Sequence, residues 1–288
     1  MSRSTRALPL VLITSLAALV GTVVTGPAAV ASSPGWLNKC GYSHSSMNDP
    51  IVFPRQPGAS HLHDFLGNRS TAARSTLRSM RAAGTTCTLK TDTAGYWAPA
   101  IYRDGARVLP RGSWAGHDTR QQIYYRDDNV APGTHIHTIP ADLRLVAGQS
   151  HAMNAAENPE LGKEIYWGCS DNSTGKLVAP PASCSSGIIS LHIGFPNCWD
   201  GVRTHANDTV HVVYPHSYRC PAKYPTALPR VILRLEYPVG PTTGTITLAS
   251  GPTYTEHGDF WNTWDQTRLN RLVADCLNTD KDCGTPTR

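Results

Sequence analysis

The cysteines constrain the fold of this 288-residue chain more than any other feature. There are eight of them, and no two have the C-x-x-C spacing that is typical of zinc–thiolate sites. In an oxidising compartment, an even set of this kind predicts four disulfide bonds. Each bond would stabilise the fold by about 2–4 kcal/mol, chiefly by restricting the unfolded chain. The sequence leaves the pairing open, and joining neighbours along the chain suggests Cys40–Cys87, Cys169–Cys184, Cys198–Cys220 and Cys276–Cys283.

The first 31 residues predict which compartment the chain enters. Arg3 and Arg6 precede an apolar run from Ala7 to Val24, and the segment ends in Ala29-Val30-Ala31, a small-x-small cleavage signal. This pattern is typical of a secretory signal peptide. A membrane anchor is the alternative, but polar residues and a Gly-Pro pair interrupt the run. We therefore expect residues 1–31 to be removed and the product to be secreted, extracellular and free of the membrane.

The rest of the chain, residues 32–288, is expected to form a single catalytic or binding domain, because it has no internal repeat and no long linker. Loss of Arg3 and Arg6 lowers the formal net charge from +5 to +3. This charge is too small to predict nucleic acid as a partner, although it slightly favours an acidic substrate. We expect a monomer.

The composition favours a mostly β protein. Only 16% of the residues are charged, and the chain has 24 glycines and 22 prolines, which is typical of many short strands joined by turns. Amphipathic helices between strands, which parallel βαβ units need, are almost absent. The predicted fold is an antiparallel β-sandwich of jelly-roll type with a few short helices, stapled by disulfides. The expected strands are Tyr96–Arg103, Gln122–Tyr125, His135–Ile139, Leu143–Val146, Glu164–Trp167, Gly187–Ile193, Val210–Tyr214, Val231–Tyr237 and Thr245–Leu248.

Two segments have a helical period. Ser70–Ala83 follows Asn68, a residue type that often precedes a helix, and Thr263–Leu277 places Leu269, Leu272 and Val273 on one face. The second segment predicts a C-terminal helix that a Cys276–Cys283 bond would close.

Histidine pairs are the strongest chemical signal. Alternate residues of a strand point to the same side, so His61 can converge with His63, His135 with His137, and His257 with Asp259. Imidazole and carboxylate groups bind zinc, copper or iron, and they also transfer protons near neutral pH. A single pair on a solvated strand edge is the ordinary alternative.

Several of these histidines are flanked by apolar or aromatic residues, where an unpartnered ring is costly. We therefore expect His61, His63, His192, His211, His257 and Asp259, or a subset of them, to meet in one cleft. The catalytic candidates are His61, His63, His211, His257 and Asp259. The metal candidates are His61, His63 and His257, with a divalent transition metal as the cofactor that these ligands favour.

The motifs HLHDFLGN, TTCTLKTDTAGYWAPAIYRDGARVLP, GIISLHIGFPNCWDG, DTVHVVYP and HGDFWNTWD resemble those of the secreted domain-of-unknown-function family numbered nineteen ninety-six. The likeness runs from about Gly41 to Asp265, and His135 and His137 fall outside its pattern. Fungal members are often joined to carbohydrate-binding modules, so the resemblance implies an extracellular polysaccharide as partner. The resemblance covers, residue by residue, His61, His63, Cys198, Trp199, Asp200, Gly201, His211, His257, Gly258, Asp259, Asn262, Trp264 and Asp265.

Aromatic residues in these motifs suggest a groove on which sugar rings stack. The substrate-binding candidates are Trp199, Asp200, Asn262, Trp264 and Tyr96. Core packing is the alternative for each aromatic ring, and turn formation is the alternative for Asp200 in Asp200-Gly201.

The leading hypothesis is a secreted enzyme that cleaves glycosidic bonds with a His/Asp cluster in an aromatic-lined cleft. A hydrolase would use two carboxyl groups, Asp259 with Asp64 or Asp200, whereas a lyase would use His211 or His257 as base. The alternative is a non-catalytic glycan- or metal-binding module. A third interpretation makes the histidines a structural polar core without a ligand.

Overall fold

Two five-stranded antiparallel sheets dominate the computed structural model, which describes Met1 and residues 33–112, 121–205 and 210–286. The predicted signal peptide, apart from Met1, lies outside the described residues. Ser33–Arg288 forms one unit by its internal contacts. In the part of the chain that is described, no helix is long and apolar enough to cross a membrane.

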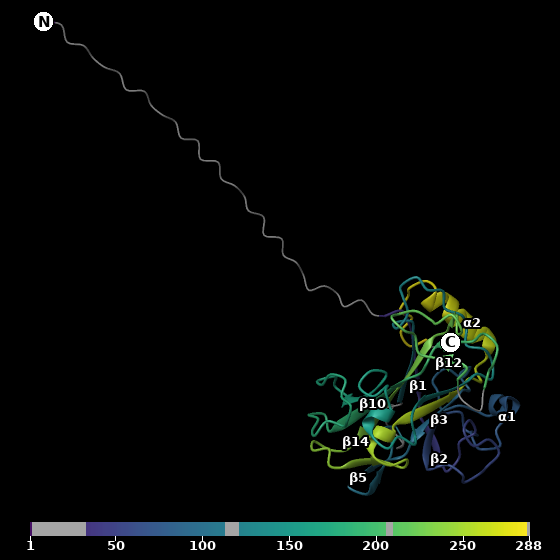
Figure 1. The fold of residues 1–288 in the computed structure, drawn as a ribbon, viewed down its shortest axis with the longest axis vertical. Helices are drawn as coiled ribbons and strands as arrows, with labels where there is room; N and C mark the ends of the chain where they lie inside the picture. The colour runs from purple at the N-terminus through teal and green to yellow at the C-terminus, as the bar shows by residue number, and fades with distance from the viewer. Residues whose placement is uncertain (2–32, 113–120, 206–209, 287–288) are drawn as a thin grey trace. The chain divides into compact units, whose positions relative to one another are not determined.

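The first sheet joins segments that are far apart in the sequence (Figure 1). Every pairing within it is antiparallel. Its strands, in spatial order, are β1 (Gly35–Cys40), β7 (Gln121–Arg126), β14 (Arg230–Pro238), β10 (Ile188–Gly194) and β9 (Ile165–Cys169).

The second sheet carries the histidine motifs on two of its strands. In spatial order its strands are β2 (Tyr42–Ser46), β3 (His63–Gly67), β4 (Gly95–Pro99), β16 (His257–Trp261) and β8 (Arg144–Gly148). Two small three-stranded sheets complete the β structure. They are β12 (Val212–Val213), β11 (Cys198–Trp199) and β13 (Thr226–Ala227), and β15 (Ile246–Leu248), β5 (Ile101–Arg103) and β6 (Ala106–Val108).

Helices are few and short. Helix α1 (Leu77–Ala82) begins where the Thr76 side chain accepts a hydrogen bond from the Ser79 amide. Helix α2 (Gln266–Leu272) begins where Asp265 accepts one from the Arg268 amide, and it continues into η3 (Val273–Leu277). The 3₁₀ turns are η1 (Ala155–Glu157) and η2 (Thr253–Thr255). The helices therefore start later than the periodic segments suggested, at residues whose side chains cap them.

The main core lies between the two large sheets. Val231, Leu233 and Leu235 alternate along β14 and are almost fully buried, as period-two patterning requires. From the second sheet, the ring of Phe260 meets those of Tyr96 and Phe195. Burial of each such side chain stabilises the fold by about 1.5–3 kcal/mol.

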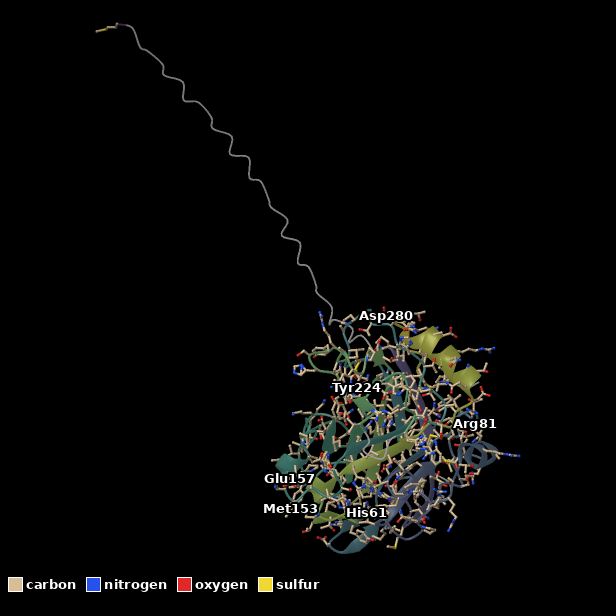
Figure 2. The ribbon with its side chains drawn as sticks, turned by 45° about the vertical axis from the view of Figure 1, so that its right-hand side comes forward. His61, Arg81, Met153, Glu157, Tyr224 and Asp280 are labelled. Atoms are coloured by element: carbon tan, nitrogen blue, oxygen red, sulfur yellow. A yellow bond between two sulfur atoms is a disulfide. The ribbon has the colours of Figure 1, made fainter. Side chains whose placement is uncertain are left out.

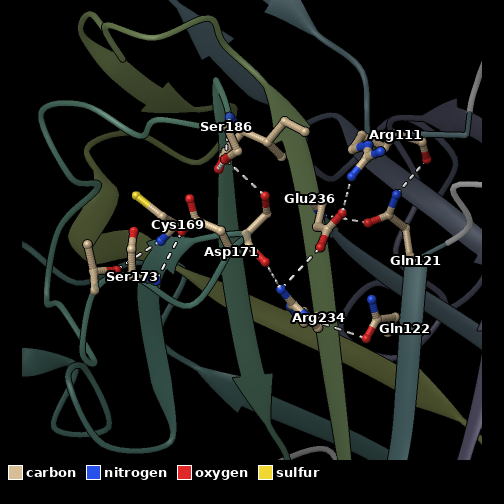
Figure 3. A network of polar contacts seen from close by, with 12 residues as sticks. Arg111, Gln121, Gln122, Cys169, Asp171, Ser173, Ser186, Arg234 and Glu236 are labelled. Atoms are coloured by element: carbon tan, nitrogen blue, oxygen red, sulfur yellow. Dashed lines mark hydrogen bonds and ion pairs between the residues drawn. The ribbon is translucent and has the colours of Figure 1, made fainter.

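The sheet faces away from this core differ from each other. On the first sheet, Glu236 forms ion pairs with Arg111 and Arg234, and Arg234 also donates a hydrogen bond to Gln122 (Figure 3). This face is therefore polar. The second sheet instead carries a small apolar cluster of Phe65, Met80, Trp97 and Trp261 there. We call this side, turned away from the first sheet, the outer face of the second sheet.

The predictions of a mostly β, antiparallel and disulfide-stapled fold with short helices are confirmed, and the arrangement is compatible with a jelly roll. All eight cysteines are paired, and each pairs with its neighbour along the chain, as suggested.

Three expected strands differ from the structure, and one of them, Val210–Tyr214, is a strand only at Val212 and Val213. His135–Ile139 is not a strand, because both backbone groups of Ile136 bond to the Asn278 side chain instead of to a neighbouring strand. The expected strand Tyr96–Arg103 is divided between β4 and β5, which belong to different sheets, and Ala100 lies between them with its amide bonded to Leu62.

Candidate metal centre and its cleft

The candidate site lies on the outer face of the second sheet, and a glycine on β16 sets its orientation. Gly258 points toward the first sheet, where an added Cβ would lie 3.0 Å from Cδ1 of Ile193. Because side chains alternate along a strand, His257 and Asp259 on either side of this glycine point outward. On β3, His63 shares this face with Phe65, whose ring belongs to the outer apolar cluster.

A proline lies between the two strands that carry the histidines. His63 of β3 is opposite Pro99 of β4, and β16 pairs with β4 through Asp259 and Trp97. The antiparallel register, carried two residues further, also places Pro99 opposite His257. Two imidazole rings from strands that are not neighbours therefore meet over the compact Pro99.

Three imidazole nitrogens converge at this point. Nε2 of His257 lies 3.1 Å from Nε2 of His61 and 3.2 Å from Nε2 of His63. His61 precedes β3 by two residues and is partly exposed, whereas His63 and His257 are almost fully buried. Figure 2 labels His61 on the folded unit. The sequence spacing therefore brings together His61, His63 and His257, the three residues expected to bind a metal.

Backbone carbonyls fix the tautomers of two of these rings. Nδ1 of His63 lies 3.1 Å from the Asn48 carbonyl oxygen, and Nδ1 of His257 lies 2.8 Å from the Thr255 carbonyl oxygen. A carbonyl oxygen only accepts, so each Nδ1 carries the proton and donates it. The Nε2 atoms of His63 and His257 consequently face each other as lone pairs. Metal-binding histidines in proteins are oriented by the same arrangement.

Burial keeps the three rings neutral at physiological pH. It lowers the pKa of His61 to about 4 and that of His257 to about 3, and it lowers the pKa of His63 well below its usual value. The neighbouring imidazoles lower each value further, since a second positive charge would be repelled. The Nε2 lone pairs of His63 and His257 remain available to a cation without loss of a proton from Nε2.

Two buried carboxyl groups lie behind the histidines. Asp259 is fully buried, and neither of its oxygens has a hydrogen-bond partner among the described residues. Burial, and secondly the charge of Asp49, raise the pKa of Asp259 well above its usual value. Oδ1 of Asp49 accepts bonds from the amides of Ile51 and Val52, and burial raises the pKa of this acid as well.

A cleft of about 400 Å³ opens beside the histidines. His61, His257 and Asp49 form part of its wall. The remaining wall is partly apolar, from Val52, Phe53, Val146, Pro159, Pro196, Val210, Val212, Val213 and Tyr214, and partly polar, from Gln149, Ser150, His151, Asn158 and Glu160. Its volume lies within the range of about 300–1,000 Å³ that small-ligand sites occupy.

The sequence model of a family described as Domain of unknown function (DUF1996) matches residues 49–264. The chain belongs to this family. The matched region contains the three histidines and both buried acids, and it confirms the resemblance seen in the motifs. Comparison with curated proteins and with solved structures gave no match.

The other catalytic and cleft candidates of this DUF1996 chain lie elsewhere. Nε2 of His211 lies 2.7 Å from the Arg144 carbonyl oxygen, and its neighbours Val210 and Val212, not His211 itself, line the cleft. The ring of His192 stacks on Tyr166, on the polar face of the first sheet.

The predicted sugar-binding residues also do not line the cleft. Tyr96 and Trp264 are fully buried and join through the hydroxyl of Tyr125. Asn262 donates to the carbonyls of Ile139 and Pro140. Trp199 and Asp200 both contact Arg203. Tyr96 and Trp264 thus pack in the core, and Asp200 accepts the Val202 and Arg203 amides as a turn residue does.

The expected carboxyl partners of Asp259 are separate from the site. Asp64 forms an ion pair with Arg107, and Asp200 forms one with Arg203. The acids near the histidines are instead Asp49 and Glu160, and both line the cleft. In the sequence, neither acid has a flanking histidine or lies in a periodic pattern. They can be identified only after the 47–62 and 149–160 segments have folded against the sheet.

Proposed function

We propose that this chain is a secreted, metal-dependent enzyme that cleaves glycosidic bonds in an extracellular polysaccharide. The observation that carries the proposal is the convergence of three imidazole Nε2 atoms at the wall of a cleft. Four disulfide bonds and the leader-like N-terminus support export.

The ligand set supports a transition metal. Zn–N bonds of about 2.0–2.1 Å place two nitrogens of a tetrahedral site about 3.4 Å apart, close to the separations of 3.1 and 3.2 Å here. Three imidazoles suit zinc, copper or iron better than calcium or magnesium. His61 and His257 reach the cleft wall, so a metal held by the three rings would be accessible to water or substrate from that side. When bound, such a metal supplies a Lewis acid and lowers the pKa of coordinated water.

Acid–base chemistry is assigned to Glu160 and His151, which share the cleft wall with the metal ligands. Burial, and secondly the charge of Glu164, raise the pKa of Glu160. A carboxyl group with a raised pKa retains its proton at higher pH and can donate it to the leaving oxygen of a glycosidic bond. The imidazole of His151 can accept a proton from water or from a sugar carbon.

A metal-binding module without turnover is the second candidate. One observation favours it, namely that Asp64 and Asp200, the expected partners of Asp259, are held in ion pairs away from the histidines. The two candidates share the metal centre and differ in whether a bond is broken.

The test uses the purified chain, stripped with chelator and reloaded separately with Zn²⁺, Cu²⁺ or Mn²⁺. Neutral and acidic polysaccharides are incubated with each form, and new reducing ends and unsaturated sugars are measured. We expect metal-restored release of oligosaccharides by the wild type and by His192→Ala, and no release by His61→Ala. Metal binding without release from any polymer would favour the binding module. Failure to bind any of the three metals would overturn both candidates.

A further inference from the structure

We infer that the carboxylates of Asp49 and Asp259 form a second cation position next to the three-histidine position. Ligand atoms of both acids and of His63, which belongs to the three-histidine position, all lie within 4.8 Å of one another. The inference deepens the proposed function and rests on the same centre. Its readout is the number of ions bound, which does not depend on turnover.

Asp259 is the first reason for a second cation. Its side chain is fully buried, and no described residue donates a hydrogen bond to either oxygen. Burial of an ionised carboxylate without a partner costs several kcal/mol, and proteins retain such a group only when it binds a proton, a counter-charge or a metal. Along β16 its neighbours on the outer face are His257 and Trp261, and neither ring donates a hydrogen bond to it.

Asp49 is the second reason. Its Oδ1 accepts two backbone hydrogen bonds at 2.9 Å, from the amides of Ile51 and Val52, so the carboxylate is held in one orientation. It is only 3% exposed, and one of its oxygens lies within 4.8 Å of an Asp259 oxygen, so two negative charges there would repel. Two acids held together in this way need either a shared proton or a cation between them.

The position of these acids favours the cation. Asp49 lines the cleft, which gives an ion a path from solvent to the buried pair. Carboxylate oxygens, with water completing the shell, suit Mn²⁺ and are also ligands of Zn²⁺. His63 lies beside both positions, but its Nε2 lone pair faces the three-histidine position and its Nδ1 donates to the Asn48 carbonyl, so the acids are the ligands of the second ion. Paired metals about 3.5–4 Å apart are common in hydrolytic enzymes, where they hold attacking and leaving oxygens.

The experiment exploits residues that belong to only one position. His61 is confined to the first group, and Asp49 and Asp259 to the second. The chelator-stripped chain is titrated calorimetrically with Zn²⁺ and with Mn²⁺, and bound metal is measured by mass spectrometry after gel filtration. We expect two ions per chain for the wild type. His61→Ala, Asp259→Asn and Asp49→Asn should each retain one, and the double variant His61→Ala/Asp259→Asn should retain none.

Two variants keep the inference falsifiable if one fails to fold. Asp259→Asn and Asp49→Asn change only charge, and thermal unfolding of each checks that the fold is intact. Glu160→Gln, on the cleft wall but outside both groups, is the matched control and should still bind two ions. One ion per wild-type chain, or two ions in both folded Asp variants, would overturn the second position. If each Asp variant loses an ion and His61→Ala loses no ion, the three-histidine position would be overturned instead.

Discussion

Nε2 of His63 lies 3.2 Å from Nε2 of His257 although the Nδ1 atom of each ring is committed to a backbone carbonyl. Neither Nε2 carries a proton in the neutral ring, so no hydrogen bond joins them. Two lone pairs at this separation repel unless a cation lies between them. The fold maintains the contact through the strand pairing of β3, β4 and β16, and a bound cation would remove this repulsion.

Metal binding should raise thermal stability. A ligand present at about 100 times its Kd, and bound only by the native state, adds about 2.7 kcal/mol to the free energy of unfolding. For a domain of this size, that corresponds to a rise in Tm of roughly 5–11 °C. Differential scanning calorimetry of the stripped chain with and without Zn²⁺ measures the shift. His257→Ala should reduce the shift, because only the second position would remain, and His192→Ala should preserve it, whereas an equal shift in both variants would place the ion elsewhere.

The orientation of the site should depend on Gly258. An alanine there would place its Cβ 3.0 Å from Cδ1 and 3.1 Å from Cγ2 of Ile193, so Gly258→Ala should destabilise the fold by about 1–3 kcal/mol. Urea unfolding measures the loss. Gly175→Ala, which has no heavy atom within 4 Å of the added Cβ, is the control. Ile193→Ala alone should also lower the free energy of unfolding, but it removes the atoms that the new Cβ would contact. The double variant should therefore lose less stability than the sum of the two single losses, and strict additivity would contradict the steric explanation.

Much of the site could be predicted from the sequence because it depends on period two. The H-x-H spacing of His61 and His63, and the HGD motif of β16, place their side chains on one face whatever the register of the sheet. The cysteines were equally informative, since each pairs with its neighbour in the chain. Local patterns of this kind survive in any fold that contains the strands.

The remaining parts depend on long-range packing, which local patterns do not encode. Trp264 and Tyr96 read as sugar-stacking residues, yet their polar atoms meet at the Tyr125 hydroxyl inside the core. Asp49 gave no signal, since it lies in an irregular segment that reaches the histidines only when this segment folds over β3. An aromatic or acidic residue shows its role only when the other side of the contact is known.

Glu160→Gln should separate catalysis from metal binding. The amide keeps the shape of the carboxyl group but cannot donate an acidic proton, so kcat on a cleaved polysaccharide should fall by about 10²–10⁴-fold. The number of bound metal ions should not change, because Glu160 belongs to neither ligand group. A variant with full kcat would remove Glu160 from the acid role. A variant that loses metal would make it part of the metal centre.

A buried acid far from the histidines should make stability depend on pH. Asp92 accepts hydrogen bonds from Asn38, Tyr96 and the Ala94 amide, yet burial outweighs these bonds and raises its pKa to about 7. The folded chain therefore binds a proton here that the unfolded chain, with its usual value of 3.8, releases at lower pH. This contribution to stability is complete below about pH 4 and is lost as the pH rises through about 7.

Asp92→Asn removes this titration, so its cost should shrink as the pH rises. The amide places a donor where Oδ2 now accepts from Asn38 and Tyr96, and we expect a loss of about 1–3 kcal/mol at pH 5. Between pH 5 and pH 8 the free energy of unfolding of the wild type should fall by up to about 1.4 kcal/mol per pH unit because of this group. The variant should not show this fall. Urea unfolding of both proteins across this range measures the difference. A destabilisation by Asp92→Asn that stays constant or grows with pH would show that Asp92 is already ionised in the native state at pH 5, since only a carboxylic acid that is protonated when folded can produce a gap that closes in this direction.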